Sequence, residues 1–252
     1  MASYTIAEVE LSNEELISLY RTEMAQYEDF PSDDLNAIFE IAVENRDRFP
    51  GITGARNPED YVSRWVKKYV DAINNPPSQR IAKPKSTCTD PAIRTIVQKS
   101  QGLSAEEAEQ GEYTHNLFMS AENIQGNLLE EYIARNVRPY GFLWCGGNVL
   151  RAIDFCNTDG SVLLQVKNKY NTENSSSSNI REGTTIEKWY RLGERTRLGR
   201  KIPYFKWETL NEIINRYKTE GEDLDPCNMT EESYQAFLST TVSGKDNIIC
   251  NQ

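Results

Sequence analysis

The hydrophobic period of this 252-residue chain changes once, near Pro139, and this change limits the folds that the chain can adopt. Before it, apolar residues recur at the spacing of helices. After it, the apolar stretches 142–144, 149–155 and 162–170 have the length and composition of strands. The turn sequence Asn157-Thr158-Asp159-Gly160-Ser161 separates the last two stretches, so we expect them to form a hairpin. Helices, then a hairpin, then further helices predict an α/β or α+β fold with one central sheet.

Helix signals accompany most of the remaining segments. Ser12 with Glu15, and Thr184 with Glu187, have the spacing of a capping box, and Ser32 can cap a further helix. The predicted helices cover about 12–27, 32–43, 61–73, 91–100, 117–136, 184–190 and 207–217. We expect three parts: a helical N-terminal region (1–110), a core around the sheet (111–220) and a weakly patterned acidic C-terminal tail packed on or near that core (221–252).

Rare residue types exclude several classes of site. His115 is the only histidine, which excludes histidine-based metal nucleases and HExxH proteases. Any Ser-His-Asp or Cys-His catalytic site would have to use this residue. The five cysteines lack CxxC spacing, so neither a disulfide framework nor a zinc knuckle is expected. The sequence has no apolar stretch of about 18 residues and no secretory signal, which predicts a cytoplasmic protein without a membrane segment.

Charge is unevenly distributed along the chain. The net charge of −10 by itself argues against a nucleic-acid partner. However, residues 135–218 hold 15 Lys and Arg against 8 Asp and Glu, so this stretch carries +7 and the remainder −17. The basic residues are densest from Lys188 to Lys206, where Glu194 is the only strong counter-charge. A basic stripe within an acidic protein indicates phosphate binding.

Three polar residues on the predicted hairpin form a candidate reaction site. Side chains alternate between the two faces of a strand, so Ile153 and Phe155 would face a core and leave Asp154 on the other side. Gln165 and Lys167 likewise share a face. The hairpin can therefore bring the carboxylate, the amide and the ammonium group to one surface.

These residue types suit phosphodiester hydrolysis with a divalent cation. Asp154 would supply a charged ligand to Mg²⁺, and the side-chain carbonyl of Gln165 and the backbone carbonyl of Val166 would add neutral ones. Lys167 would orient the attacking water, help to deprotonate it, or offset charge that grows on the phosphate. An exposed hairpin with ordinary polar residues is the alternative.

The preceding helix can supply a second carboxylate ligand. In Gly126-Asn-Leu-Leu-Glu130-Glu131, the two glutamates flank the apolar face of the helix on opposite sides. Either one can reach the rim of a site at the sheet edge, so the helical wheel does not choose between them. A structural pair of surface glutamates stays open as well.

The segments GNLLEEYIA, IDF and LLQVKNKYNTENSSSSNIREGTTIEKWYR, within about residues 120–205, resemble the SinI-type family of type II restriction endonucleases. More broadly, they resemble the PD-(D/E)xK nuclease superfamily, which implies a restriction-endonuclease-like mixed sheet flanked by helices and Mg²⁺ as the cofactor. The resemblance implies catalytic positions for Asp154, Gln165 and Lys167, and the place of a helix glutamate for Glu130. The chain departs from the pattern at Ile153, where proline is usual, and at Gln165, where an acid is usual. The second departure removes one negative charge from the metal site.

The resemblance also implies double-stranded DNA as the substrate. Family members cut an interrupted palindrome, GGWCC with W being A or T, which calls for a homodimer with one active site per strand. A cognate DNA methyltransferase would protect the host genome. Amide, serine and basic side chains after Lys167 suit base edges and phosphates, and a glutamate can accept a hydrogen bond from cytosine. The residues expected to contact DNA are Asn171, Glu173, Asn174, Ser175, Ser176, Ser177, Ser178, Asn179, Arg181, Lys188, Arg191 and Arg195.

Two other functions stay open on the sequence alone. One is a non-catalytic, sequence-specific DNA-binding protein that uses the same basic stripe. The other is a DNA repair or structure-selective nuclease of the same superfamily. The N-terminal region would dimerise, contact DNA, or do both.

Overall fold

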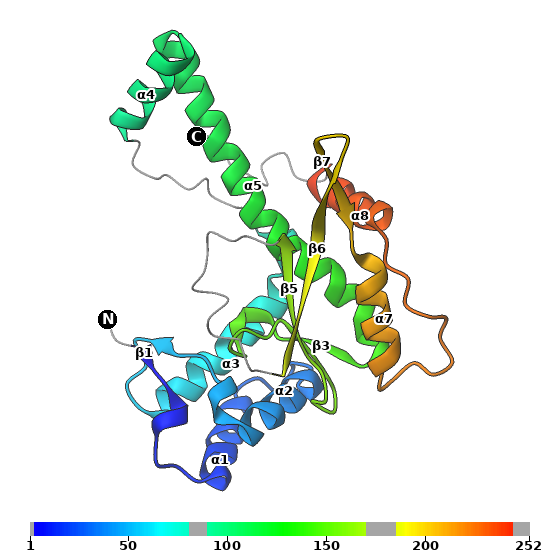
Figure 1. Cartoon of the computed structure of the whole chain (residues 1–252). Coiled ribbons are helices and arrows are strands. Elements are labelled where there is room, and N and C mark those ends of the chain that lie inside the picture. The colour runs from blue at the N-terminus through cyan, green and yellow to red at the C-terminus, as the bar shows by residue number, and fades with distance from the viewer. Residues whose placement is uncertain (1–2, 81–89, 170–184, 244–252) are drawn as a thin grey trace.

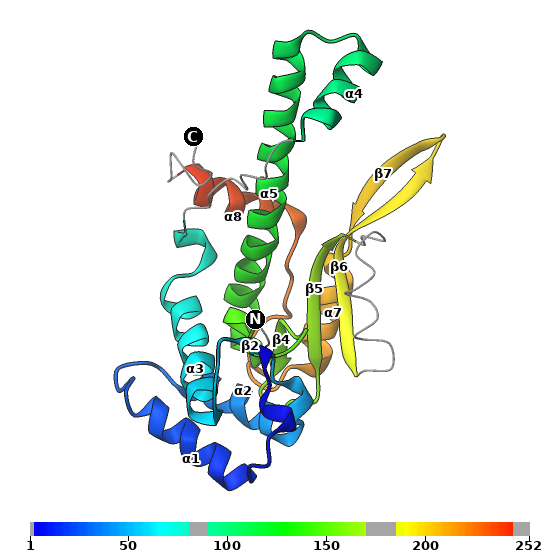
Figure 2. The same ribbon diagram turned by 90° about the vertical axis from the view of Figure 1, so that its left-hand side faces the viewer.

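A computed structural model describes residues 3–80, 90–169 and 185–243 of the chain (Figures 1 and 2). Its N-terminal part holds helices α1 (Asn13–Met24), α2 (Asp33–Glu44) and α3 (Pro58–Asn74), with the short strands β1 (Ser3–Tyr4) and β2 (Ile52–Thr53). Helix α4 (Pro91–Gln101) and the 33-residue helix α5 (Ala105–Val137) follow. Helices α7 (Trp207–Tyr217) and α8 (Glu231–Ser243) come after the sheet. None of the helices in the described part of the chain has the length and apolar character that crossing a membrane requires.

The central sheet has five strands in the order β3-β4-β5-β6-β7. Strands β5 and β6 run parallel, and the other neighbours are antiparallel. This mixed sheet, flanked by helices and preceded by a helical region, confirms the predicted α+β fold. The strands are β3 (Phe142–Trp144), β4 (Phe155–Asn157), β5 (Leu163–Lys169), β6 (Ile186–Arg197) and β7 (Arg200–Phe205).

Two hydrophobic cores lie on the two faces of the sheet. The first joins α1, α2 and α3 to buried residues of β3, β4 and β5, and the second joins the same sheet to α5, α7 and α8. Alternation along β5 places Leu163 in the first core and Leu164 and Val166 in the second. Gln165 and Lys167 therefore share the face of Leu163.

Several predicted elements are confirmed. The capping box of Ser12 and Glu15 opens α1, and helices occupy the predicted segments near 33–44, 58–74, 91–101 and 207–217. Strands β4 and β5 form the predicted hairpin. Ser32 stands at the N-cap of α2, but its side chain makes no capping hydrogen bond. The helix predicted from residue 117 begins twelve residues earlier, at Ala105, where Ser104 and Glu107 form a capping box.

Three predictions are wrong. Residues 149–155 do not form a strand, because left-handed φ angles at Gly147 (76°) and Ala152 (64°) bend the chain, and only Phe155 enters β4. Ile153 and Phe155 consequently lie in different cores. The helix predicted over 184–190 is strand β6 within the described residues. Helix α8, in the acidic C-terminal segment, was not predicted from the sequence; its fully buried Tyr234 packs in the second core.

Candidate active site

Backbone hydrogen bonds fix Asp154 between two parts of the sheet. It lies one residue before β4, its N–H donates to the Leu164 carbonyl at 2.9 Å, and its carbonyl accepts from the Cys145 N–H at 2.9 Å. Its carboxylate Oδ2 accepts the backbone N–H of Val166 at 2.8 Å. The carboxylate is therefore held beside β5, at the residue that separates Gln165 from Lys167.

The side-chain oxygen of Gln165 is buried. The residue is 2% exposed, and among the described residues no donor makes a hydrogen bond to its Oε1. Leaving a buried acceptor unsatisfied costs about 1–3 kcal/mol. A cation that approaches this oxygen would remove that cost, because a neutral amide oxygen is a suitable ligand for Mg²⁺.

Glu130 extends toward the same place from α5. Its Oε2 accepts a hydrogen bond from Trp144 Nε1 at 3.3 Å, which fixes the side chain against β3. Burial, and after it the nearby Asp154 carboxylate, raises the pKa of Glu130 to about 7, whereas the Trp144 hydrogen bond and Lys167 lower it. Asp154 and Lys167 thus both lie within electrostatic reach of Glu130.

Glu131 faces a different part of the molecule. It is 2% exposed, and its carboxylate accepts the backbone N–H of Ser78 at 2.6 Å and the Ser78 hydroxyl at 2.5 Å. Arg135, one turn later on α5, pairs with it at 2.5 Å. These bonds anchor the 3₁₀ turn Pro77–Gln79 to α5. Glu130, and not Glu131, is the helix carboxylate that faces Asp154.

We take Glu130, Asp154, Gln165 and Lys167 together as the candidate active site. In the described part of the chain, no group of three or more His, Cys, Asp or Glu side chains gathers that could hold a metal ion. A metal at the candidate active site would therefore rest on two carboxylates and on neutral oxygens, those of Gln165 and of the Val166 backbone. This donor set fits a hard cation that retains water and phosphate ligands, as Mg²⁺ does.

The residues expected to contact DNA have different positions. Asn171, Glu173, Asn174, Ser175, Ser176, Ser177, Ser178, Asn179 and Arg181 lie outside the described residues. Lys188 stands opposite Gln165 in the parallel register of β5 and β6. Arg195 is exposed on β6.

Arg191, in contrast, is buried inside the protein. It is 8% exposed, its Nη1 pairs with both oxygens of Glu231 at 2.6 and 2.7 Å, and its Nε donates to Asn168 at 3.0 Å. Its guanidinium also lies 5.1 Å from the Phe205 ring centroid and 5.2 Å from that of Tyr234. This arginine ties α8 to the sheet, so we assign it no contact with DNA.

Sequence reasoning missed two features around the candidate active site. Trp144, the hydrogen-bond partner of Glu130, carried no signal beyond its place in an apolar stretch. The second feature is the β6–β7 ribbon, which extends beyond the other strands (Figure 2). Its turn is Leu198-Gly199, with left-handed φ angles of 52° and 72°. That Leu-Gly pair within the basic stripe was the available sign of a hairpin.

A family model and two known proteins match much of this chain. A family model described as SinI restriction endonuclease matches residues 57–221, which extends well before the segments that showed the resemblance. The type II restriction enzyme Eco47I of Escherichia coli is 36% identical over 159 residues, which cover 62% of this chain and 62% of that enzyme. The type II restriction enzyme SinI of Salmonella infantis is 35% identical over 172 residues, covering 63% of this chain and 73% of that enzyme. The chain thus matches less than two thirds of the length of the Eco47I enzyme.

Proposed function

The chain belongs to the SinI restriction endonuclease family, and from this premise we propose that it is a type II restriction endonuclease. It would make Mg²⁺-dependent double-strand cuts in a short palindromic site of the GGWCC type. The observation that carries the proposal is on β5: no donor among the described residues bonds to the buried Oε1 of Gln165, and the next residue, Val166, donates its N–H to the Asp154 carboxylate. Glu130 adds a second carboxylate from α5.

Each residue of the candidate active site has a separate task in this reaction. Asp154, Glu130, Gln165 Oε1 and the Val166 carbonyl would hold the cation. Mg²⁺, when bound, would polarise the scissile phosphate and acidify the attacking water. Lys167 would orient that water and offset the negative charge that grows on the phosphoryl oxygens. Attack on phosphorus forms one P–O bond and breaks the bond to the 3′-oxygen, so the ends carry 5′-phosphates and 3′-hydroxyls.

The β6–β7 ribbon is the element that we propose for DNA contacts within the described residues. Arg195, Arg197 and Arg200 are exposed on it, and Lys201 is paired with Glu194 at 2.9 Å. A two-stranded ribbon fits the major groove of B-DNA. Its basic side chains would bind phosphates, while the polar residues between Asn171 and Arg181 would contact base edges. We further propose a homodimer on the palindrome and a cognate methyltransferase that protects the host DNA.

Digestion of a sequenced plasmid tests the proposed function. The wild type with Mg²⁺ is expected to give discrete fragments whose sequenced ends lie at GGWCC sites, and Asp154→Ala is expected to bind the same DNA without cutting it. A gel shift without fragments from the wild type would instead indicate a DNA-binding protein. Cuts without a common sequence would indicate a structure-selective nuclease. Normal cutting by Asp154→Ala would refute the assignment of the active site.

A further inference from the structure

Helix α4 and the first half of α5 form an arm that stands clear of the rest of the described chain (Figures 1 and 2). We define the arm as residues 90–119. Helix α4 has no buried residue, and the arm contributes no side chain to either hydrophobic core. A helix of eleven residues without burial is marginal in water, because most helix stability in proteins comes from packing of an apolar face. The arm therefore presents surface that a partner would cover.

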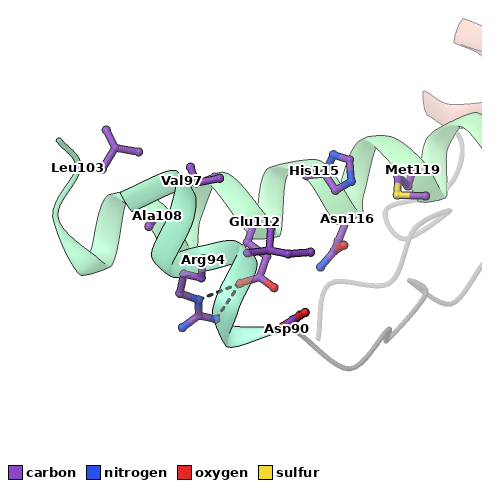
Figure 3. A pocket seen from close by; sticks show the side chains of 11 residues that line it. Asp90, Arg94, Val97, Leu103, Ala108, Glu112, His115, Asn116 and Met119 are labelled. Carbon is purple, nitrogen blue, oxygen red and sulfur yellow. Dashed lines mark hydrogen bonds and ion pairs between the residues drawn. The ribbon is translucent and has the colours of Figure 1, made fainter. Parts of the chain in front are cut away.

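The exposed surface of the arm is unusually apolar. Six of the eleven large hydrophobic side chains that are exposed in the described residues lie on it: Ile93 (62%), Ile96 (66%), Val97 (42%), Tyr113 (49%), Phe118 (67%) and Met119 (43%). A groove of about 620 Å³ runs between the two helices, with Val97, Leu103 and Met119 among its lining residues (Figure 3). Three of the six, Ile93, Val97 and Met119, line this groove, and large exposed apolar surface marks interaction sites.

The charges of the two helices indicate which partner fits. Helix α4 is basic, with Arg94 and Lys99, whereas residues 105–116 of α5 carry four glutamates and no Lys or Arg. The Arg94 guanidinium pairs with Glu112 at 2.8 Å and joins the helices within one chain (Figure 3). The acidic half of the arm would repel DNA phosphates. In a two-fold dimer of arms, the basic helix of each copy would pack against the acidic helix of the other. Each copy would then make the same favourable charge contacts, as a two-fold interface requires.

We propose that the arm is the dimer interface of this protein, with the arms of two copies forming a four-helix bundle. The arm spans 30 residues, so it is long enough to supply most of the roughly 20–30 residues per partner of a standard interface. Helix α5 runs without interruption from the arm to Glu130, so the bundle would set the separation of the two active sites. The inference deepens the proposed function, which needs two copies on a palindrome, although the surface of the arm supports it independently.

Sedimentation equilibrium of the 252-residue protein without DNA, over a range of concentrations, tests the interface by measuring the mass of the species in solution. The wild type is expected to be a dimer. Ile96→Asp and Phe118→Asp are expected to raise its dissociation constant roughly 100-fold or more, because each substitution enters a two-fold interface twice. Leu224→Asp, at a side chain that is 46% exposed outside the arm, serves as the matched control and is expected to leave the dimer intact. The variants are expected to fold, because neither hydrophobic core contains a residue of the arm. Far-ultraviolet circular dichroism checks this.

A monomeric wild type, or arm variants that dimerise as tightly as the wild type, would overturn the interface. This outcome is distinguishable from a failure of the proposed function. A monomer that still gives discrete plasmid fragments would refute only the interface, whereas a dimer that is dissociated by Ile96→Asp but never cuts DNA would refute only the nuclease.

Discussion

Replacing Glu130 by glutamine is expected to stabilise the metal-free protein and to abolish its activity. In the folded protein the pKa of Glu130 is raised from 4.5 to about 7 by burial and by Asp154. The folded state therefore retains a proton that the unfolded state releases, and the wild type loses stability as the pH rises from 4.5 to about 7. Each pKa unit corresponds to about 1.4 kcal/mol, so ionising Glu130 in the folded state costs on the order of 3 kcal/mol at a pH of about 8. Glutamine removes this cost and can still accept the Trp144 hydrogen bond.

The assay is urea unfolding in EDTA at two pH values. At a pH of about 8, Glu130→Gln should raise the free energy of unfolding by roughly 3 kcal/mol, and at a pH of about 5 by less than about 1 kcal/mol. The exposed Glu212 on α7 is the matched control. Glu212→Gln should change the free energy of unfolding by less than about 0.5 kcal/mol at either pH. The same Glu130 variant should lose plasmid cleavage, because it removes a carboxylate from the metal site. A stability gain that is absent, or equal at both pH values, would refute the electrostatic account of Glu130.

Four further substitutions separate the roles of neighbouring residues. Gln165→Glu restores a third carboxylate and should tighten Mg²⁺ binding about 10-fold by calorimetry; unchanged affinity would contradict a metal at this oxygen. Glu131→Gln should lower the free energy of unfolding by about 2 kcal/mol but leave the cleavage rate of the folded enzyme near that of the wild type. A lower cleavage rate with unchanged stability would instead indicate a catalytic role for this residue. Arg191→Ala should lower the free energy of unfolding by about 3 kcal/mol in urea unfolding, because it removes the cationic partner of the largely buried Glu231. Arg195→Ala should leave stability unchanged and lower the salt slope of DNA binding by about 1, and an unaltered slope would exclude a phosphate contact there.

The elements that could be predicted from the sequence are those with local signals. The capping box of Ser12 and Glu15 and the turn between β4 and β5 act over a few residues, so their outcome depends little on the rest of the chain. The hairpin also brought Asp154 near β5, because both belong to one short stretch of sequence.

The features that could not be predicted depend on distant partners. Thr184 and Glu187 have the spacing of a capping box, but parallel pairing with β5 makes the residues that follow a strand, and local propensity is a weak prior against tertiary context. The orientation of Glu131 depends on Ser78, 53 residues away, and the burial of Arg191 depends on Glu231, 40 residues away. Neither a helical wheel nor a charge count can identify these distant partners.

Crystals of the protein with a GGWCC duplex and Mn²⁺ in place of Mg²⁺ would show directly whether the candidate active site holds a catalytic cation. An anomalous peak is expected within about 2.5 Å of both the Asp154 carboxylate and Gln165 Oε1, next to a DNA phosphate. A peak bound by other residues, or a bound duplex with no peak beside Gln165, would contradict this expectation.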